Sequence, residues 1–530
     1  MKILAGLAMA IGLATGALAA DDPAFTSFAQ QQQAMASGAV SAESLTKAYL
    51  QRIEAMNRKG PRLNAVIALN PNALAEARKL DAERKAGKVR GALHGVPILL
   101  KDNIDSADGT ATTAGSLALK DNITGRDAPL VRRLTDAGAV ILGKANLSEW
   151  ANYRSSRSIS GWSAVGGLVR NPHALDRGAC GSSSGSGAAV AAGLAAGAIG
   201  TETDGSITCP ATMNGIVGLK PTVGLVSRTH VVPISASQDT AGPMTRNVAD
   251  AAALLTALAG TDPADPATRD ADTRRTDYLK SLDAGALRGA RIGVLRNMAG
   301  RHPDIDAVYG KALDALKAAG AILVEVKTPD TTAIGEAEDK ILATEFKAGV
   351  NAYLASTSPQ QVKTRTLADL IAFNETNASR EMPLFGQETF KKAQATPGLD
   401  DPAYLKARDD GRRLAGPEGI DKWLKDANVE VLVAISGGAA PRVDPVIGSR
   451  WLGSFSSPAA VAGYPHLTVP MGEVAGLPIG LSFVGPAWSE ARLLSLGYAF
   501  EQATQARRTP SFAASVDLRP EIAQAYDVTP

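Results

Sequence analysis

The chain has 530 residues, of which 45% are hydrophobic and 20% charged, an ordinary composition for a soluble globular protein. Its 55 lysines and arginines nearly balance 53 aspartates and glutamates, and no long basic run accompanies them, which argues against nucleic acid as a partner. The chain also lacks the repeat of roughly 20–50 residues that indicates a solenoid.

Residues 1–20 have the pattern of a secretory signal peptide. A positively charged start precedes an apolar run over residues 3–18, and Ala-Leu-Ala at 17–19 fits a cleavage site. The run is too short and too rich in glycine and alanine to anchor the chain in a bilayer. We therefore expect export to the periplasm or the medium. The mature chain, residues 21–530, should be a monomer without stable membrane association.

Helical and strand patterns alternate along the mature chain. Ser41 is placed to cap an amphipathic helix, and a short strand over 63–69 and a charged helix over 73–85 follow it. The continuous apolar run over 96–100 predicts a buried strand that carries Lys101 at its end. Residues 128–151 predict a helix, a glycine stop, an apolar strand and a new helix after Asn146. Further strands are predicted at 290–295, 321–326, 429–435, 466–472 and 478–485.

This alternation predicts an α/β fold, a single large domain whose mixed central sheet is covered by helices on both faces. Residues 331–422 are more helical and more polar and show no clear strand. Because the strand at 429–435 resumes the core pattern, we interpret 331–422 as a helical insertion or cap over the site.

The cysteines and histidines predict neither a disulfide scaffold nor a metal site. Cys180 and Cys209, the only cysteines, flank a serine-rich stretch. An oxidising compartment would allow them to pair, but we expect two small, buried, unpaired side chains. The five histidines are scattered singly and no HExxH or CxxC spacing occurs, so we expect no metal and no cofactor.

Two serine motifs are poor matches to known catalytic patterns. Residues 181–185 read G-x-S-x-G with Ser183 as the nucleophile, but that elbow needs an apolar strand directly before it. Ser44 and Lys47 match S-x-x-K within a plain amphipathic helix, without the partner motifs. The glycine-serine loop also reads as a linker, yet it leads into residues 188–200, predicted as a buried helix that is apolar all round.

A lysine can activate a serine if burial removes its proton, because desolvation disfavours the ammonium. Lys101 is the candidate, since its apolar strand should carry it into the interior. Lys120 repeats the Lys-Asp-Asn sequence but precedes a surface-like loop. The alternative for Lys101 is a salt bridge with Asp102 or another carboxylate, and the residues alone leave both interpretations open.

Three segments decide between these interpretations: GVPILLKDNID at 95–105, the run from CGSSSGSG to GLVSR at 180–228, and SQDTAGPMTRNVADAA at 237–252. Together they resemble the amidase signature family, over nearly the whole mature chain. CGSSSGS and TETDGSITCP are most similar to its bacterial peptide-amidase branch, exported enzymes that remove the C-terminal amide of peptides. Ser184 and Asp204 stand where most of the family has glycine.

The resemblance implies a Ser–Ser–Lys triad, with Ser206 as the acylated nucleophile, Ser182 as the bridging serine and Lys101 as the base. It also implies a cis peptide bond between Gly181 and Ser182. The oxyanion hole would consist of the backbone N–H groups of Thr203, Asp204, Gly205 and Ser206.

The sequence therefore predicts a secreted serine amidase that hydrolyses carboxamides through an acyl-enzyme, with the C-terminal amides of peptides as its substrates. Three alternatives remain: an amidase of small aliphatic or aryl amides, an amidotransferase A subunit, and a non-catalytic binding protein on the same fold. The predicted export and the neutral charge balance argue against the amidotransferase. The expected partner is a small-molecule or short-peptide amide.

Overall fold

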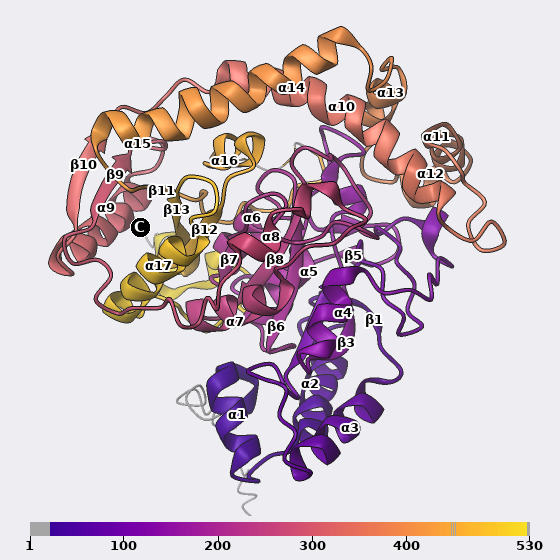
Figure 1. Ribbon diagram of the computed structural model, residues 1–530, viewed down its shortest axis with the longest axis horizontal. Helices are drawn as coiled ribbons and strands as arrows, with labels where there is room; N and C mark the ends of the chain where they lie inside the picture. The colour runs from indigo at the N-terminus through magenta and orange to yellow at the C-terminus, as the bar shows by residue number, and fades with distance from the viewer. Residues whose placement is uncertain (1–21, 447, 449, 451, 527–530) are drawn as a thin grey trace, which may run out of the picture.

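A mixed sheet of eleven strands, in the order β1-β3-β2-β6-β8-β7-β12-β13-β11-β9-β10, forms the centre of the α/β domain (Figure 1). The computed structural model describes residues 22–526 except 447, 449 and 451, and the predicted signal peptide, residues 1–20, lies outside this range. The strands are β1 (Val66–Leu69), β2 (Pro97–Lys101), β3 (Val140–Ala145), β6 (Gly197–Glu202), β7 (Val217–Lys220), β8 (Thr240–Thr245), β9 (Arg291–Leu295), β10 (Ile322–Val326), β11 (Val431–Ile435), β12 (His466–Val474) and β13 (Leu477–Val484).

Helices flank this sheet, as the alternating sequence pattern predicted. The longer ones are α2 (Ala42–Met56), α3 (Ala73–Lys85), α7 (Val248–Leu258), α9 (Pro303–Ala318), α10 (Thr332–Ala355), α14 (Pro402–Ala415) and α17 (Glu490–Thr504). The shorter ones are α1 (Phe28–Ala36), α4 (Pro129–Asp136), α5 (Ser184–Ala191), α6 (Thr208–Met213), α8 (Ala271–Arg274), α11 (Leu367–Thr376), α12 (Ala378–Glu381), α13 (Glu388–Gln394), α15 (Asp421–Ala427), α16 (Ser457–Ala462) and α18 (Pro520–Tyr526). Of the helices in the described part of the chain, none has both the length and the apolar character needed to cross a bilayer.

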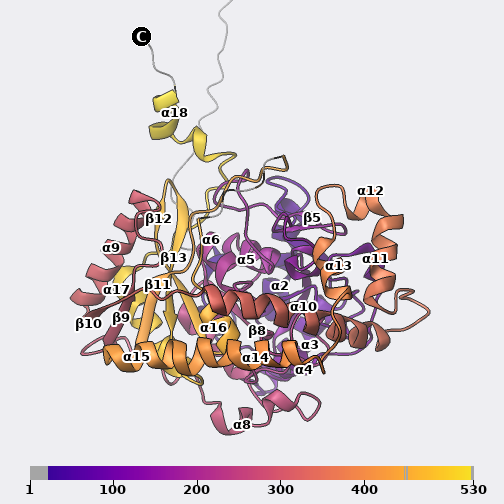
Figure 2. The ribbon, with the colours of Figure 1, turned by 90° about the horizontal axis from the view of Figure 1, so that it is seen from above.

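The helices of residues 332–427 form an outer arch. α10 and α14 pack against each other and run along the top of Figure 1. Figure 2 shows α11, α12 and α13 at the opposite end of the molecule from α9, β9 and β10. No strand interrupts residues 327–430, all of which the structure describes. The interpretation of 331–422 as a cap over the site stays a prediction.

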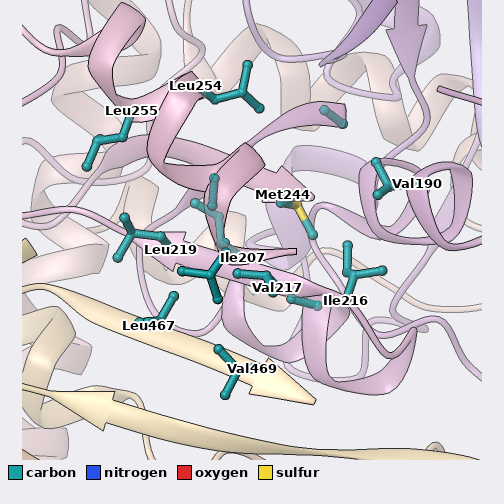
Figure 3. Packing of buried hydrophobic residues seen from close by; sticks show 14 of the residues in the cluster. Val190, Ile207, Ile216, Val217, Leu219, Met244, Leu254, Leu255, Leu467 and Val469 are labelled. Carbon is teal, nitrogen blue, oxygen red and sulfur yellow. The ribbon is translucent and has the colours of Figure 1, made fainter. Parts of the chain in front are cut away.

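The apolar core lies around the central strands. β2, β3, β6, β7 and β8 are buried along their whole length, and so is every residue of α5. Figure 3 shows how Val190 of α5, Leu254 and Leu255 of α7 and Leu467 and Val469 of β12 enclose β7 and β8. Because β2 and β6 pair in parallel, their carboxyl ends, Lys101 and Glu202, lie at the same edge of the sheet.

Several predicted elements agree closely with the structure. The helix after Ser41 begins with a capping box, in which Ser41 and Ser44 exchange backbone-to-hydroxyl hydrogen bonds of 2.8 and 3.0 Å. The Ser44 hydroxyl of the S-x-x-K match thus serves as a helix cap. The strand ending at Lys101 and the five strands predicted beyond residue 290 are present as well.

Two helix predictions are wrong. Residues 188–200 do not form one helix: α5 ends at Ala191, Gly193 follows with a left-handed φ of 68°, and residues 197–202 form β6. A run of alanine and glycine carries no periodicity that separates a buried helix from a buried strand. After Asn146 the chain forms only a short 3-10 turn at Glu149–Asn152, since Trp150 and Ala151 have φ angles of 48° and 53°.

A glycine in β6 permits the close packing behind the serine loop. A Cβ on Gly200 would lie 2.7 Å from Met244 Sδ and 2.9 Å from Ser183 Oγ. We predict that Gly200→Ala lowers the free energy of unfolding by about 1–3 kcal/mol, the usual cost of overpacking.

The matched control is Gly310→Ala in α9, where nothing lies within 4 Å of an added Cβ. This change should stabilise the protein by about 0.5–1 kcal/mol, because glycine is the poorer helix former. Urea unfolding of both variants measures the two effects, and equal stabilities would contradict the packing argument.

Candidate active site

Lys101 reaches from the end of β2 across the neighbouring strand β6. Its side chain is fully buried, and its Nζ lies 2.7 Å from Ser182 Oγ, 2.8 Å from Thr201 Oγ1 and 3.1 Å from Thr201 O, within hydrogen-bond distance of each. The alternative salt bridge is not found: among the described residues no carboxylate lies within ion-pair distance of Lys101. Asp102 instead accepts a hydrogen bond from Thr113 Oγ1.

Burial decides the charge state of Lys101. Desolvation lowers its pKa from 10.5 to about 7, while the negative charges of Asp239 and Glu202 oppose this shift. A large fraction of the amine is therefore neutral at neutral pH and able to accept a proton. Lys120, the competing lysine, is 60% exposed beside Asp121 and has no such environment.

The two serines of the predicted triad come from neighbouring loops. Ser182 is fully buried in the loop before α5, and the Gly181–Ser182 peptide bond is cis, as the resemblance implied. Ser206 is 7% exposed in the turn between β6 and α6. The N–H of Ser183 donates to Ser206 O at 3.1 Å, which brings the two loops side by side.

The other serines of the cluster have structural partners. Ser183 Oγ donates to Thr201 O at 3.1 Å and accepts from Thr201 N–H at 3.2 Å, so its hydroxyl joins the loop to β6. Ser186 Oγ donates to Ile199 O at 3.3 Å. Ser184 Oγ lies 3.3 Å from Ser148 Oγ. These contacts leave Ser183 without a base, which disfavours the nucleophile-elbow interpretation.

The turn from Thr203 to Ser206 presents free backbone donors. In the described part of the chain, no group accepts a hydrogen bond from the N–H of Thr203, Asp204, Gly205 or Ser206. Gly205 has a φ of 75°, a left-handed conformation that suits glycine. Four donors at one turn beside a serine form an arrangement that can stabilise an oxyanion.

Acidic side chains hold this turn from both sides. The buried Glu202 Oε2 accepts the N–H groups of Ile207 and Thr208 at 2.6 and 2.9 Å. Asp239 accepts the Thr203 hydroxyl at 2.6 Å, and burial raises its pKa to about 6. The sequence alone did not single out Glu202, Asp239 or Thr201. All three lie within the segments that resemble the amidase signature family. The sequence marks them only by position, since Thr201 and Glu202 lie shortly before Ser206 and Asp239 lies in the Gln-Asp-Thr sequence at 238–240.

Helix α16 and the arch helix α10 contact the same turn. Ser457 of α16 donates its hydroxyl to Asp204 Oδ2 at 2.6 Å. Gln238 Nε2 donates to Glu338 of α10 at 2.7 Å and lies 3.4 Å from Thr203 O. Burial, with the nearby charge of Asp204, raises the pKa of Glu338 well above its usual value. α10 and α16 therefore fix the orientation of the turn that carries Ser206.

Cys180 and Cys209 form a disulfide with their Cα atoms 5.9 Å apart, so the prediction that they stay unpaired is wrong. The fold places the loop before α5 next to the start of α6, and the 29-residue separation in sequence carries no sign of this contact. The pair is almost fully buried in a small apolar cluster.

A cleft of about 430 Å³ opens beside these loops. Cys180 and Met213 line it, whereas Ser182 and Ser206 do not. The lining mixes hydroxyl, charged and apolar groups from residues 156–160, Gly178, Leu384, Pro441 and residues 443–446. Such a mixture suits an elongated ligand with alternating polar and apolar groups. Among the described residues no group of three or more histidine, cysteine or acidic side chains is placed to hold a metal ion.

Comparisons with known proteins show the family of the chain. The Amidase family model matches residues 44–494, so the chain belongs to the amidase signature family. A probable amidase of Arabidopsis thaliana is 40% identical over 489 residues, 90% of this chain and 89% of the relative. The A subunit of the glutamyl-tRNA(Gln) amidotransferase from Moorella thermoacetica is 35% identical over 483 residues, 88% of this chain and 94% of the relative.

Solved structures give a stronger similarity. The X-ray structure of peptide amidase from Stenotrophomonas maltophilia is 55% identical, with a TM-score of 0.87 over 92% of this chain and 98% of that one. A peptide amidase in complex with the competitive inhibitor chymostatin is 55% identical, with a TM-score of 0.88 over 92% and 99% of the two chains.

The shifted pKa of Lys101 predicts a pH-dependent stability. Between pH values of about 10.5 and about 7, this lysine is charged in the unfolded chain and neutral in the folded chain. The free energy of unfolding therefore decreases as the pH falls through this window. Lys101→Met removes this effect. The Tm of the variant minus that of wild type should therefore grow from high pH to pH 7 and become constant below it.

Thermal unfolding followed by circular dichroism across this range measures the difference. Lys88→Met, at an exposed position, is the control, and its Tm difference should not vary with pH in the same way. A pH-independent difference for Lys101→Met would mean that the buried lysine keeps an ordinary pKa.

Proposed function

We propose that this protein is a serine amidase that removes the C-terminal amide of peptides through an acyl-enzyme on Ser206. The observation that carries the proposal is the contact between Lys101 Nζ and Ser182 Oγ, at 2.7 Å, in a buried place that lowers the pKa of the lysine to about 7. A neutral amine hydrogen-bonded to a serine is a general base that needs no histidine.

In the proposed reaction, Lys101 takes the proton of Ser182 while Ser182 takes that of Ser206, whose Oγ attacks the amide carbonyl carbon. The proton then returns through Ser182 to the amide nitrogen, which leaves as ammonia, and an ester remains on Ser206. Water attacks this ester, gives its proton to the same relay, and releases the carboxylic acid with Ser206 restored.

The backbone N–H groups of residues 203–206 would stabilise the negative oxygen of the tetrahedral intermediate. Their free donors and the side-chain contacts of Glu202 and Asp239 support this role, because a preorganised hole must not reorient during the reaction. Donors of this kind typically contribute about 2.7–4 kcal/mol each to transition-state stabilisation.

The choice of peptide amides is supported by the 55% identity to peptide amidase structures, one of which holds a competitive inhibitor. The mixed polar and apolar lining of the 430 Å³ cleft suits a peptide better than an acyl chain. Export is supported by the pattern of residues 1–20 and by the disulfide, since disulfides persist in oxidising compartments. The amidotransferase alternative has the weaker similarity, 35% to the Moorella thermoacetica protein.

Substitution of the triad gives the first test. Ser206→Ala should abolish both turnover and labelling by a fluorophosphonate, while Ser182→Ala and Lys101→Ala should lower kcat by roughly three orders of magnitude or more. Ser186→Ala is the control, because its hydroxyl bonds only Ile199 O in the core. Labelling that persists in Ser206→Ala would sink the assignment of the nucleophile.

The second test concerns the substrate. We expect ammonia release from dipeptide and tripeptide amides at a higher kcat/KM than from long-chain fatty amides or anilides, and no cleavage of internal peptide bonds. This selectivity would come from steric exclusion, because a continuing peptide chain would not fit on the leaving-group side. An apolar pocket discriminates less, by about 1–3 kcal/mol for each methylene group. Faster turnover of any fatty amide or anilide than of every peptide amide would overturn the proposal.

A further inference from the structure

The Cys180–Cys209 disulfide joins the two chain segments that carry the serines of the site. Cys180 lies two residues before Ser182, and Cys209 lies three residues after Ser206. We propose that this disulfide is a positioning device for the reaction, which holds the segment of Ser182 against the segment of Ser206. The inference rests on the roles proposed above for the two serines.

The need for such a device follows from the geometry of the relay. Proton transfer between two hydroxyls requires their oxygens to be about 2.6–3.2 Å apart, and a misplacement of about 1 Å can reduce a rate 10²-fold. Ser182 belongs to the loop before α5 and Ser206 to the turn before α6, so any relative movement of these two segments changes that distance directly.

Hydrogen bonds between the two segments are few. The Ser183 N–H donates to Ser206 O at 3.1 Å, and Asn214 Nδ2, at the end of α6, donates to Ala179 O at 2.8 Å. Each can break and re-form with water when the segments shift. Apart from the main chain itself, the disulfide is the one covalent link between these segments in the described structure, and it lies closer in sequence to both proposed catalytic serines than the Asn214 contact does.

The backbone at Cys180 gives an independent reason. Cys180 has a φ of 54°, a left-handed conformation that non-glycine residues adopt only when their surroundings hold it. Its side chain is held by the bond to Cys209 and by an apolar cluster of Ala174, Met213, Ala440, Leu477 and Val516. Without the sulfur–sulfur bond, only the apolar cluster opposes a return of Cys180 to an ordinary φ, and such a rotation would move the next two residues, the second of which is Ser182.

A purely structural role is the competing explanation, because Cys180 also lines the substrate cleft. Loss of the bond would then lower stability or weaken peptide binding and leave the nucleophile intact. A small fluorophosphonate separates the two roles, since its reaction with Ser206 needs the aligned hydroxyls and does not need the cleft to be filled.

The test uses the double variant Cys180→Ser/Cys209→Ser at temperatures well below its Tm. We expect the rate of Ser206 labelling and kcat for a dipeptide amide to fall together by roughly 10–100-fold, with KM nearly unchanged. The matched control, Val516→Ala, removes an apolar contact from the same cluster. It should lower Tm while the labelling rate stays at the wild-type value.

If the double variant does not fold, reduced wild type replaces it. A water-soluble phosphine breaks the sulfur–sulfur bond, takes an oxygen atom from water to become the phosphine oxide, and leaves two thiols. The labelling rate should fall as two thiols per chain appear and should recover on reoxidation by air.

A wild-type labelling rate in the double variant, or in the fully reduced protein, would overturn the positioning role. So would two titratable thiols in denatured protein that was never exposed to reductant, because the disulfide would then be absent. The proposed function fails separately, through labelling that survives Ser206→Ala, so the two failures are distinguishable.

Discussion

Lys101 is buried at the centre of the molecule without a carboxylate in ion-pair contact, and this constraint shapes the rest of the site. A charged ammonium there would cost several kcal/mol in lost hydration, which lowers the pKa to about 7 and leaves a large fraction of the amine neutral at neutral pH. A neutral amine still needs hydrogen-bond partners. Thr201 and Ser182 provide oxygens, and the parallel pairing of β2 with β6 brings them within reach. The same desolvation that weakens the fold gives the lysine the low pKa that the proposed base requires.

The two acidic side chains whose charges act on Lys101 form their hydrogen bonds with the turn and not with the lysine. Glu202 and Asp239 use their lone pairs to accept hydrogen bonds from the backbone and hydroxyl groups of residues 203–208. From that distance their charges raise the pKa of Lys101 without cancelling the effect of burial. A carboxylate moved into contact with Nζ would keep the lysine protonated and remove the base. The separation therefore allows one turn to be held rigidly while the amine beside it stays neutral, at a cost in stability that is common at active sites.

The sequence predicted the outer parts of this fold better than its centre. Strands rich in valine, isoleucine and leucine, such as 96–100, 290–295 and 429–435, carry the expected signal and are present. The sequence did not predict β6, β7 and β8. Their sequences, GAIGTE, VGLK and TAGPMT, are short and rich in small residues, and they show no clear strand pattern. Their strand character comes from pairing with neighbours, which local propensity does not encode. The disulfide was missed for the same reason, whereas Lys101, Ser182 and Ser206 came from the family motif and not from periodicity.

Small residues at the centre explain both the missed strands and the site. A Cβ on Gly185 would lie 2.2 Å from Ala65 O, so a larger residue there would push α5 away from the chain before β1. A Cβ on Gly200 would lie 2.9 Å from Ser183 Oγ, so a larger residue there would push the loop before α5 away from β6. That contact lets the lysine of β2 and the serine before α5 meet over the edge of β6. The walls of the 430 Å³ cleft come from other segments, 156–160 and 443–446, and from Leu384 near the arch. The proposed reaction and the proposed selectivity thus depend on different parts of the chain, and a family can change the cleft walls while the small-residue core stays the same.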